Sequence, residues 1–570
     1  SYERWAATYD THTSESLESL RKHVESFARK PLISVVMPVY HRKAEDEGWL
    51  RKAIESVLNQ AYPHWELCIA DDASPAPHVK PLLDSYVKRD RRIKVVHRPQ
   101  NGHISAASNS ALEIATGEYT ALMDHDDELP PHALYEVASL LSARPDTDLV
   151  YSDEDKIDEE GRRHEPYFKP DFLPDLFTSQ NYLSHLSVYR TELVRAVGGF
   201  RVGYEGSQDW DLALRVVERT VPERIRHIPK VLYHWRAIPG STAMLLSEKN
   251  YPVEAARRAL TDHFARIGEN VELIPVPGDH WRIKRPIPDS APLVSLVIPS
   301  RNGLKLLSRC VDTILAKTDY PNYEILIVDN GSDDPDTLAY LQKIAGNNVV
   351  VLRYDAPFNY SAINNYGVKH ARGEIIGLLN NDLEIIHADW LREMVSQVVR
   401  PQVGCVGAML YYPNETIQHA GVIVGLGGVA GHGFRDFPRG TEGKFNRARL
   451  VQNYSSVTAA CLLVRRAVFE QVGGLDEGLA VAFNDIDFCL KVQAAGYRNL
   501  WTPFAECYHH ESASRGAEDT PEKHERFRKE VETMLQRWKD SIAHDPAYNP
   551  NLTLELTDFS LAAPPRSWTP

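Results

Sequence analysis

The sequence predicts two tandem α/β domains, each built on a mainly parallel sheet flanked by helices. The main observation is that the chain repeats itself in order. PLISVVMP at 31–38 returns as PLVSLVIP at 292–299, and DWDLALR at 209–215 returns as DIDFCLK at 485–491. A repeat of this length is a duplicated domain, because solenoid repeats are only tens of residues long. A length of 570 residues also suits two domains of about 250 residues each.

The first copy alternates buried strands with amphipathic helices. Residues 1–30 precede it and carry apolar side chains at helical spacing, so we expect an N-terminal helical leader. Continuous apolar runs predict buried strands at 32–39, 66–70, 93–97 and 119–123. Helical patterns cover 50–58 and 104–115. Such alternation with short connections is typical of a doubly wound sheet, whose ligands bind beyond the carboxyl ends of its strands.

The second copy repeats this order. Strands are predicted at 293–298, 324–328, 349–353 and 374–379, and helices at 304–316 and 361–371. A closing helix is expected over 520–542, because Thr520 can cap it and Pro521 suits its first turn. The predicted organisation is a first domain at 31–280, a Pro-rich linker at 281–291, a second domain at 292–545 and an extended tail at 546–570.

The composition argues against several classes of protein. A net charge of −14 argues against a nucleic-acid partner held by its phosphates. The six cysteines form no C-x-x-C pair, so neither a zinc knuckle nor a disulfide framework is indicated, and a cytoplasmic location is the simplest interpretation. The sequence has no run of 18 apolar residues and no signal-peptide pattern. A P-loop, a dinucleotide fingerprint and a G-x-S-x-G elbow are also missing.

Acidic side chains follow two predicted strands of the first copy. The pair Asp71-Asp72 follows the strand at 66–70, and the run DHDD at 124–127 follows the strand at 119–123. Carboxylates at such an edge suit Mg²⁺ or Mn²⁺, which bridge protein oxygens to substrate phosphates. A solvated acidic turn is the alternative for DHDD alone, but the surrounding pattern recurs in the second copy. There the run is Asn380-Asn381-Asp382, with one carboxylate, so weaker metal binding is expected.

One aspartate opens a helix late in each copy, Asp209 in the first and Asp485 in the second. An aspartate at this place often serves only as a helix cap. Here each precedes by about 25 residues a strand that ends in Tyr-His, with the histidines His234 and His509. A carboxylate held beside a substrate can act as a general base. The histidines could complete a metal shell or contact a diphosphate, and the alternative is a structural role.

These blocks, in this order and present twice, resemble the inverting glycosyltransferase family 2, whose members have the GT-A fold. The resemblance rests on the strands that run into PVY at 38–40 and PSR at 299–301, the turns DDAS and DNGS, the D-x-D-type motif and the late aspartate. It covers nearly the whole chain.

The resemblance assigns a role to particular residues of each copy. The nucleotide would be held by Pro38, Val39, Tyr40, Asp71, Asp72 and Asp124 in the first copy, and by Pro299, Ser300, Arg301 and Asp329 in the second. The metal would be held by Asp124, Asp126 and His234, and in the second copy by Asp382 and His509, or His510 in its place. Asp209 and Asp485 would be the catalytic bases.

The function that this resemblance implies is a bifunctional, metal-dependent inverting glycosyltransferase. Its cofactor would be Mg²⁺ or Mn²⁺ and its donor a UDP- or dTDP-sugar. The acceptor would be a glycan or lipid-linked glycan in the assembly of a bacterial surface polysaccharide such as O-antigen or capsule. The protein would be cytoplasmic, or peripheral at the inner face of the plasma membrane beside other glycan-assembly proteins.

Two alternatives stay open at this point. One copy could be a catalytically silent carbohydrate-binding or scaffold module, and the single carboxylate makes the second copy the candidate. A nucleotidyltransferase is the other, although residues 40–48 lack the basic, Gly-rich loop that a triphosphate needs. The second copy is also about 20 residues longer near 411–450, in a Gly- and Arg-rich stretch. An insertion near a site tends to change what is bound, so we expect a different acceptor there.

Overall fold

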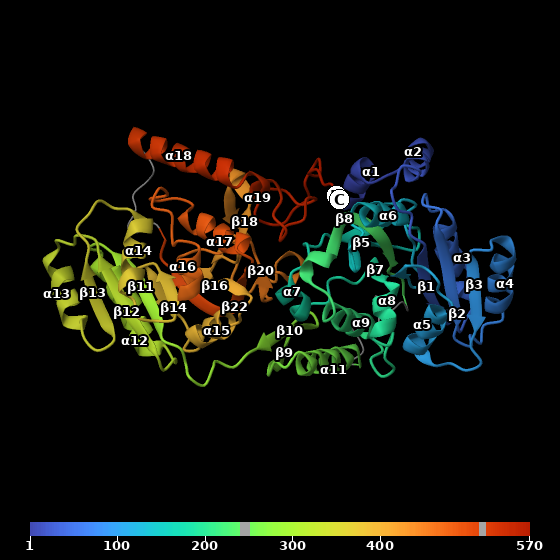
Figure 1. Ribbon diagram of the computed structural model, residues 1–570, viewed down its shortest axis with the longest axis horizontal. Helices are drawn as coiled ribbons and strands as arrows, with labels where there is room; N and C mark the ends of the chain where they lie inside the picture. The colour runs from blue at the N-terminus through green and yellow to red at the C-terminus, as the bar shows by residue number, and fades with distance from the viewer. Residues whose placement is uncertain (240–250, 512–519) are drawn as a thin grey trace.

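A computed structural model of the chain describes residues 1–239, 251–511 and 520–570. Two α/β domains lie side by side, the first in blue and green and the second in yellow and orange (Figure 1). A two-stranded hairpin of β9 (Glu272–Val276) and β10 (His280–Lys284), together with helix α11 (Tyr251–Arg266), lies near the junction between them. The predicted α/β class is confirmed.

The first domain is built on a mixed sheet with strand order β3-β2-β1-β4-β7-β5-β6, in which β8 also pairs with β5. Its strands are β1 (Ile33–Val39), β2 (Trp65–Asp71), β3 (Ile93–His97), β4 (Tyr119–Leu122), β5 (Leu149–Ile157), β6 (Arg163–Tyr167), β7 (Ser187–Arg190) and β8 (Ile225–Arg236). The neighbours β3, β2, β1 and β4 run parallel, and β7 is antiparallel to both β4 and β5.

Helices cover both faces of this sheet, which explains why its central strands are apolar throughout. Ile33, Val35 and Met37 pack on the face of α3, α4 and α6, and Val36 packs on the face of α5 and α9. The helices of this domain are α1 (Tyr2–Tyr9), α2 (Ser14–Val24), α3 (Glu47–Leu58), α4 (Val79–Arg89), α5 (His103–Glu113), α6 (Ala133–Ala143), α7 (Pro174–Ser179), α8 (Thr191–Ala196) and α9 (Gln208–Val217).

The second domain repeats this sheet with strand order β13-β12-β11-β14-β21-β16-β22-β15. Its strands are β11 (Val294–Ser300), β12 (Tyr323–Asp329), β13 (Val349–Arg353), β14 (Ile375–Leu379), β15 (Leu383–Ile385), β16 (Val403–Tyr411), β17 (Ile417–His419), β18 (Val422–Val424), β19 (Ala430–His432), β20 (Gln452–Asn453), β21 (Cys461–Arg465) and β22 (Arg498–His509). Its helices are α12 (Leu304–Lys317), α13 (Pro335–Ile344), α14 (Tyr360–His370), α15 (Trp390–Val398), α16 (Arg466–Gln471), α17 (Asn484–Ala494), α18 (Pro521–Arg537) and α19 (Lys539–Ala543).

Strand register brings the acidic motifs to one edge of each sheet. In the first domain Val39 pairs with Asp71, and Val36 pairs with Leu122, the last residue of β4. In the second domain Ser300 pairs with Asp329, and Val297 pairs with Leu378. The turns DDAS and DNGS and the D-x-D-type motifs therefore follow neighbouring parallel strands at their carboxyl ends, where ligands bind in sheets of this kind.

A buried ion cluster joins the two domains. Asp175 on α7 of the first domain accepts hydrogen bonds from Arg400 Nη2 at 2.7 Å, Arg498 Nε at 2.8 Å and Asn453 Nδ2 at 2.7 Å, all from the second domain. Asp175 is 4% exposed. Burial would raise its pKa, but the two guanidinium groups outweigh this effect and lower it. The carboxylate therefore stays charged and holds the domains in one arrangement.

Residues after α19 return to the first domain. Asn549 Nδ2 donates to Asp153 Oδ2 and to the Lys169 carbonyl, both at 2.8 Å, and Trp5 Nε1 donates to the Ala562 carbonyl at 2.7 Å. This stretch, drawn in red, runs from α19 toward α1 (Figure 1). The residues predicted as an extended tail thus contain no helix or strand, but they are packed against the first domain.

Other elements differ in detail from the predictions. The leader forms two helices, α1 and α2, where one was expected. The closing helix is split at Trp538 into α18 and α19. Residues 281–284 of the predicted linker belong to β10, because the apolar Trp281 and Ile283 pack into the core. Among the described residues, none of the helices combines the length and hydrophobicity that crossing a bilayer requires.

Candidate functional site

Each domain has an Asp turn at the end of its second strand, and the two turns are held in the same way. The Ser74 amide donates to Asp71 Oδ1 at 3.1 Å, and Ser74 Oγ accepts from the His41 amide. In the second domain the Ser332 amide donates to Asp329 Oδ1 at 3.1 Å, and Ser332 Oγ accepts from the Asn302 amide. The turn therefore ties the ends of β1 and β2 together, or of β11 and β12, beside Tyr40 or Arg301.

The residue after each turn aspartate has different partners in the two domains. Asp72 accepts from Arg98 Nε and the Gly102 amide, both at 2.9 Å. Asn330 instead donates through Nδ2 to the carbonyls of Tyr354 and Ala356. The first domain thus places a carboxylate–guanidinium pair where the second has only a neutral amide.

Three imidazoles lie close together beside the Asp turn of the first domain. His41 Nδ1 lies 3.1 Å from His78 Nε2, and the rings of His41 and His125 lie 4.7 Å apart. Burial, followed by the other two imidazoles, lowers the pKa of His41 to about 3. This residue is therefore neutral at physiological pH. His41 and His78 could not be identified from the sequence, because single histidines in loops carry no periodic signal.

The DHDD run lies directly beyond β4 and meets a histidine from another loop. Ligand atoms of Asp124, Asp127 and His185 all lie within 4.8 Å of one another. His185 stacks on Tyr233, with ring centroids 4.3 Å apart and planes 10° apart. The Tyr233 hydroxyl donates to Asp127 and accepts from the Asp124 amide at 3.1 Å, so it fixes both ends of the run.

The carboxyl groups of this cluster repel one another. Burial, and then the charges of Asp126 and Asp124, raise the pKa of Asp127, whose side chain is 0% exposed. Burial, with smaller contributions from Asp126 and Asp209, also raises the pKa of Asp124, although its side chain remains 39% exposed. A cation would relieve this repulsion.

The arrangement fits a divalent cation. Two carboxylates offer the hard oxygen ligands that Mg²⁺ and Mn²⁺ prefer, and imidazole is an acceptable additional ligand for Mn²⁺. The nitrogen of His185 that faces this cluster is Nε2, which lies 3.9 Å from Asp124 Oδ2. The cluster contains Asp124 from the predicted metal set, whereas its histidine is His185.

The predicted ligand His234 lies against other partners. Its Nδ1 is 2.5 Å from Asp155 Oδ1, and Asp155 also accepts from Arg163 Nε at 2.6 Å. The backbone of His234 pairs with Glu128, one residue beyond the DHDD run. The structure therefore places the His234 backbone next to the acidic run and its ring in a separate ion-pair network.

The predicted base of the first domain, Asp209, lies in the first turn of α9 and near the acidic cluster. Its Oδ2 accepts a hydrogen bond from Asn181 Nδ2 at 3.3 Å, and its negative charge contributes to the raised pKa of Asp124. Ser207 is the N-cap residue of this helix. The neighbour of Asn181, Gln180, donates to the Phe445 carbonyl at 3.2 Å, so the insertion of the second domain reaches the surroundings of this aspartate.

The second domain brings its single metal-motif carboxylate together with the predicted histidine. Asp382 Oδ1 lies 3.0 Å from His509 Nε2, and both residues are buried. On the other side of the ring, His509 Nδ1 lies 3.2 Å from Gln418 Oε1. Asn381 Nδ2 donates to Ser300 Oγ at 3.2 Å, which ties the motif to the end of β11.

The insertion adds two further imidazoles to this region. His419 on β17 and His432 on β19 face each other, with their Nδ1 atoms 2.9 Å apart. Burial is the main effect that lowers the pKa of both, and that of His432 falls to about 4. The sequence of this stretch shows only that it is Gly-rich, because the pairing of its histidines depends on the β18–β19 hairpin.

The predicted base of the second domain, Asp485, is more firmly held than Asp209. Its Oδ2 accepts from the Ala459 amide at 3.1 Å and its Oδ1 from the Ile486 amide at 2.9 Å. Burial raises its pKa, against the effect of these hydrogen bonds. Asp485 lies in the first turn of α17. The two aspartates thus occupy equivalent positions in equivalent helices.

Two relatives match nearly the whole chain. The uncharacterized protein y4gI of Sinorhizobium fredii strain NGR234 is 53% identical over 96% of this chain and 60% of its own length. The O-antigen biosynthesis protein RfbC of Myxococcus xanthus is 39% identical over 99% of this chain and 43% of its own length. The chain therefore spans about half the length of these relatives.

Solved structures resemble one half of the chain at a time. GalNAc-T7 with UDP, GalNAc and Mn²⁺ has a TM-score of 0.37 at 16% identity and covers 46% of this chain and 50% of its own. S. aureus TarS 1–349 in complex with UDP-GlcNAc has a TM-score of 0.33 at 20% identity and covers 41% of this chain and 66% of its own.

The family model for glycosyl transferase family 2 matches residues 34–198 and again residues 295–473. These two segments begin with β1 and β11 and contain the nucleotide turn and the D-x-D-type motif of each domain. The family predicted from the ordered blocks is thus confirmed, as is the GT-A class of both domains. The chain belongs to glycosyl transferase family 2 and is a glycosyltransferase that carries the family's domain twice.

Proposed function

We propose that the chain is a bifunctional, metal-dependent inverting glycosyltransferase that transfers two sugars, one in each domain, to a growing bacterial surface glycan. The observation that carries this proposal is the duplicated site. Each domain has an Asp turn, a carboxylate beyond its fourth strand and an aspartate in the first turn of a helix. A domain that had become a scaffold would be under no physical requirement to keep all three.

The chemistry of the first domain begins with Asp209. A sugar hydroxyl is a poor nucleophile, so a base must take its proton as it attacks the anomeric carbon. Asp209 is half-buried, is oriented by Asn181 and is close enough to sense the charge of Asp124. A bound Mg²⁺ or Mn²⁺ would stabilise the charge of the leaving diphosphate. A single displacement of this kind inverts the anomeric centre.

Asp485 would play the same role in the second domain. Its pKa is raised by burial, which makes the carboxylate a stronger base. The ligands for a cation here would be Asp382 and His509, with Ser300 and Asp329 at the nucleotide turn. In the first domain, His234 is proposed to support the metal site of that same domain through Glu128 and Asp155.

The donor is proposed to be a UDP- or dTDP-sugar and the acceptor a glycan or lipid-linked glycan. The O-antigen role in the name of RfbC supports a surface polysaccharide. A lipid-linked acceptor would place the protein at the inner face of the plasma membrane, held peripherally or through other assembly proteins.

The test uses the full chain and a panel of UDP- and dTDP-sugars with short synthetic acceptors. We expect acceptor-dependent release of nucleoside diphosphate, and its loss in the double variant Asp209→Asn/Asp485→Asn. Release of pyrophosphate instead would indicate a nucleotidyltransferase.

A catalytically silent second domain is the other candidate, and the run Asn380-Asn381-Asp382 favours it because only one carboxylate remains. Product masses decide between the two. A product that never gains more than one sugar, with the same result for wild type and Asp485→Asn, would identify the second domain as silent.

A further inference from the structure

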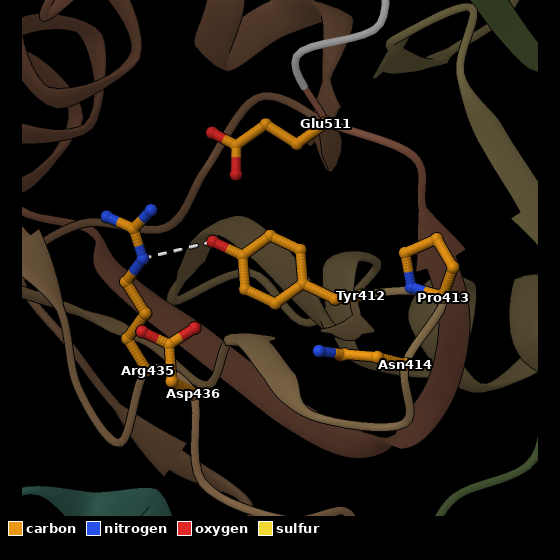
Figure 2. Close-up of a pocket in the computed structure, with 6 residues that line it drawn as sticks. All are labelled: Tyr412, Pro413, Asn414, Arg435, Asp436 and Glu511. Carbon is orange, nitrogen blue, oxygen red and sulfur yellow. Dashed lines mark hydrogen bonds between the residues drawn. The ribbon is translucent and has the colours of Figure 1, made fainter.

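The second domain has an open cavity of about 460 Å³ that none of the roles above uses. It is lined by Tyr412, Pro413, Asn414, Arg435, Asp436 and Glu511 (Figure 2). Tyr412 is half-buried, and the charged side chains around it are exposed. Arg435 and Asp436 belong to the 411–450 stretch that makes this domain longer than the first.

The cavity adjoins the proposed active site through each of the three segments that form it. Glu511 comes two residues after His509, and Arg435 comes three residues after His432. The turn that carries Tyr412 and Asn414 leads into β17 and Gln418. Extended chain covers about 3.3 Å per residue, so Glu511 and Arg435 lie within about 10 Å of His509 and His432 along the chain. Tyr411, next to Tyr412, pairs with Ile417, next to Gln418.

His509 lies between Asp382 and Gln418. Its Nε2 faces Asp382, on the side of β11 and the nucleotide turn. Its Nδ1 faces Gln418, on the side of the insertion. The turn that lines the cavity leads into Gln418, so a ligand in the cavity would approach from the Nδ1 side of His509, opposite Asp382.

The lining side chains suit an uncharged sugar. Tyr412 presents an aromatic ring of the kind that packs against the C–H face of a pyranose, and Arg435 Nε donates to its hydroxyl at 3.0 Å (Figure 2). Asn414 can donate and accept, whereas Asp436 and Glu511 accept hydrogen bonds from hydroxyl groups. Burial, and then the charge of Glu511, raise the pKa of Tyr412 to about 12, so its hydroxyl keeps its proton.

The charge of the lining disfavours an anionic ligand. Two carboxylates, Asp436 and Glu511, outnumber the single guanidinium of Arg435. A diphosphate or a uronic acid would lie beside uncompensated negative charge, which costs free energy in a partly desolvated site. A ligand rich in hydroxyl groups meets no such repulsion.

We propose that this cavity binds a neutral sugar unit of the acceptor glycan used by the second domain. The proposal rests on the function proposed above and names the acceptor subsite of the second reaction. It also explains why the insertion is confined to one domain, because only the second domain would then recognise the acceptor in this way.

Binding is tested directly on the full chain by saturation-transfer NMR with glucose, galactose, mannose, rhamnose and N-acetylglucosamine, and with inorganic pyrophosphate as the anionic probe. We expect at least one neutral sugar to bind wild-type protein, and this signal to be lost in Tyr412→Ala. Tyr497→Ala is the matched control, because Tyr497 is a half-buried tyrosine of the same domain that bonds to Gln471. Asn414→Ala, at an exposed position, gives a second variant with little risk to folding.

Kinetics then separate this inference from the proposed function. In Tyr412→Ala the acceptor KM of the second transfer should rise about tenfold or more, while the donor KM and the first transfer stay unchanged. Absence of any sugar turnover by wild-type protein would refute the proposed function, whatever the binding result. The inference itself is overturned if no sugar of the panel binds, if Tyr412→Ala binds it as well as wild type, or if pyrophosphate displaces it from the cavity.

Discussion

The two domains share one backbone frame but carry different chemical groups at the same edge of it. The first has carboxylates at Asp124, Asp126 and Asp127, with the loop histidine His185. In the second, Asn380 and Leu383 stand at the positions of Asp124 and Asp127, and the carboxylate at the position of Asp126, Asp382, is paired with His509 on β22. Strand register thus fixes where these side chains lie, while the sequence of the loop after the strand decides whether they are carboxylates or amides.

The Asp turns of the two domains also differ in the side chains that pair with them. In the first domain Asp71 pairs with His97 and Asp72 with Arg98. In the second, Asp329 pairs with Arg353, and Asn330 bonds only to backbone carbonyls. The arginine that pairs with the turn follows the last residue of β3 in the first domain (Arg98) and is the last residue of β13 in the second (Arg353). The two turns thus carry different charges, and under the proposed function this difference would suit two different donors.

The strongest test of the comparison is to remove one base at a time. Asp209→Asn keeps the shape of the side chain but cannot take a proton, so the first transfer should fall by about 10²–10⁴-fold. Asp485→Asn should do the same to the second transfer alone. The measurement is the mass of the product on two synthetic acceptors, one of which already carries the first sugar. Two variants that both lose every transfer on both acceptors would indicate one composite site.

Chelation should separate the domains by a smaller margin. Excess EDTA should reduce the first transfer by about 100-fold, because the charge of the leaving diphosphate would face the carboxylates without a cation. The second transfer, with a single carboxylate and more imidazole, should need a higher Mn²⁺ concentration for half-maximal rate. Titration of Mn²⁺ into chelated protein measures both. Full first-domain activity in EDTA would contradict the proposed metal site.

The contact between the domains can be broken at Asp175. Asp175→Ala leaves the half-buried Arg400 and Arg498 without their carboxylate, and the free energy of unfolding should fall by about 3 kcal/mol. Asp146→Ala, which removes an exposed partner of Arg226, is the matched control and should have little effect. Urea unfolding followed by tryptophan fluorescence measures both variants. Equal stability of the two would show that the cluster does not hold the domains.

The smallest expected effect is a pH dependence that belongs to the first domain. Although burial opposes it, Asp153 and Asp171 raise the pKa of His227 from 6.5 to about 9. Because the folded pKa lies above the unfolded value, this stabilisation is complete below pH 6.5 and is lost as the pH rises through 9. The shift corresponds to about 3 kcal/mol.

His227→Gln should therefore flatten the decline in stability between pH 6.5 and 9, measured by urea unfolding at both values. An unchanged slope would show that His227 is not responsible. The equivalent strand of the second domain, β22, has its buried histidine–carboxylate pair at its last residue, where His509 meets Asp382.

The sequence predicted the parts of the fold that follow from hydrophobic pattern. The strand predicted at 93–97 matches β3, and that at 349–353 matches β13, because apolar runs flanked by turns leave little choice. The two aspartates proposed as bases were predicted at helix starts, and the structure has them in the first turns of α9 and α17. Local signals of this kind need no knowledge of tertiary contacts.

The remaining site residues depend on contacts between distant segments. His185 reaches Asp124 from a loop about 60 residues later, and its stacking on Tyr233 is set by β8. His419 and His432 meet only because β18 and β19 form a hairpin. The split of the closing helix at Trp538 likewise follows a tertiary contact, since its indole donates to Asp487 at 2.9 Å. The spacing of residues in the sequence carries no signal for tertiary contacts of this kind.

The stretch after α19 has a consequence for how the protein is made. Domains fold in the order in which they leave the ribosome. Here, however, Asn549 completes the hydrogen bonds of Asp153, and Asn551 those of the Pro229 carbonyl, in a domain synthesised much earlier. These contacts of the first domain can therefore form only after the second domain has emerged. A chain that stops before residue 545 would lack them, so under the proposed function the chains able to add only the first sugar would be incompletely packed.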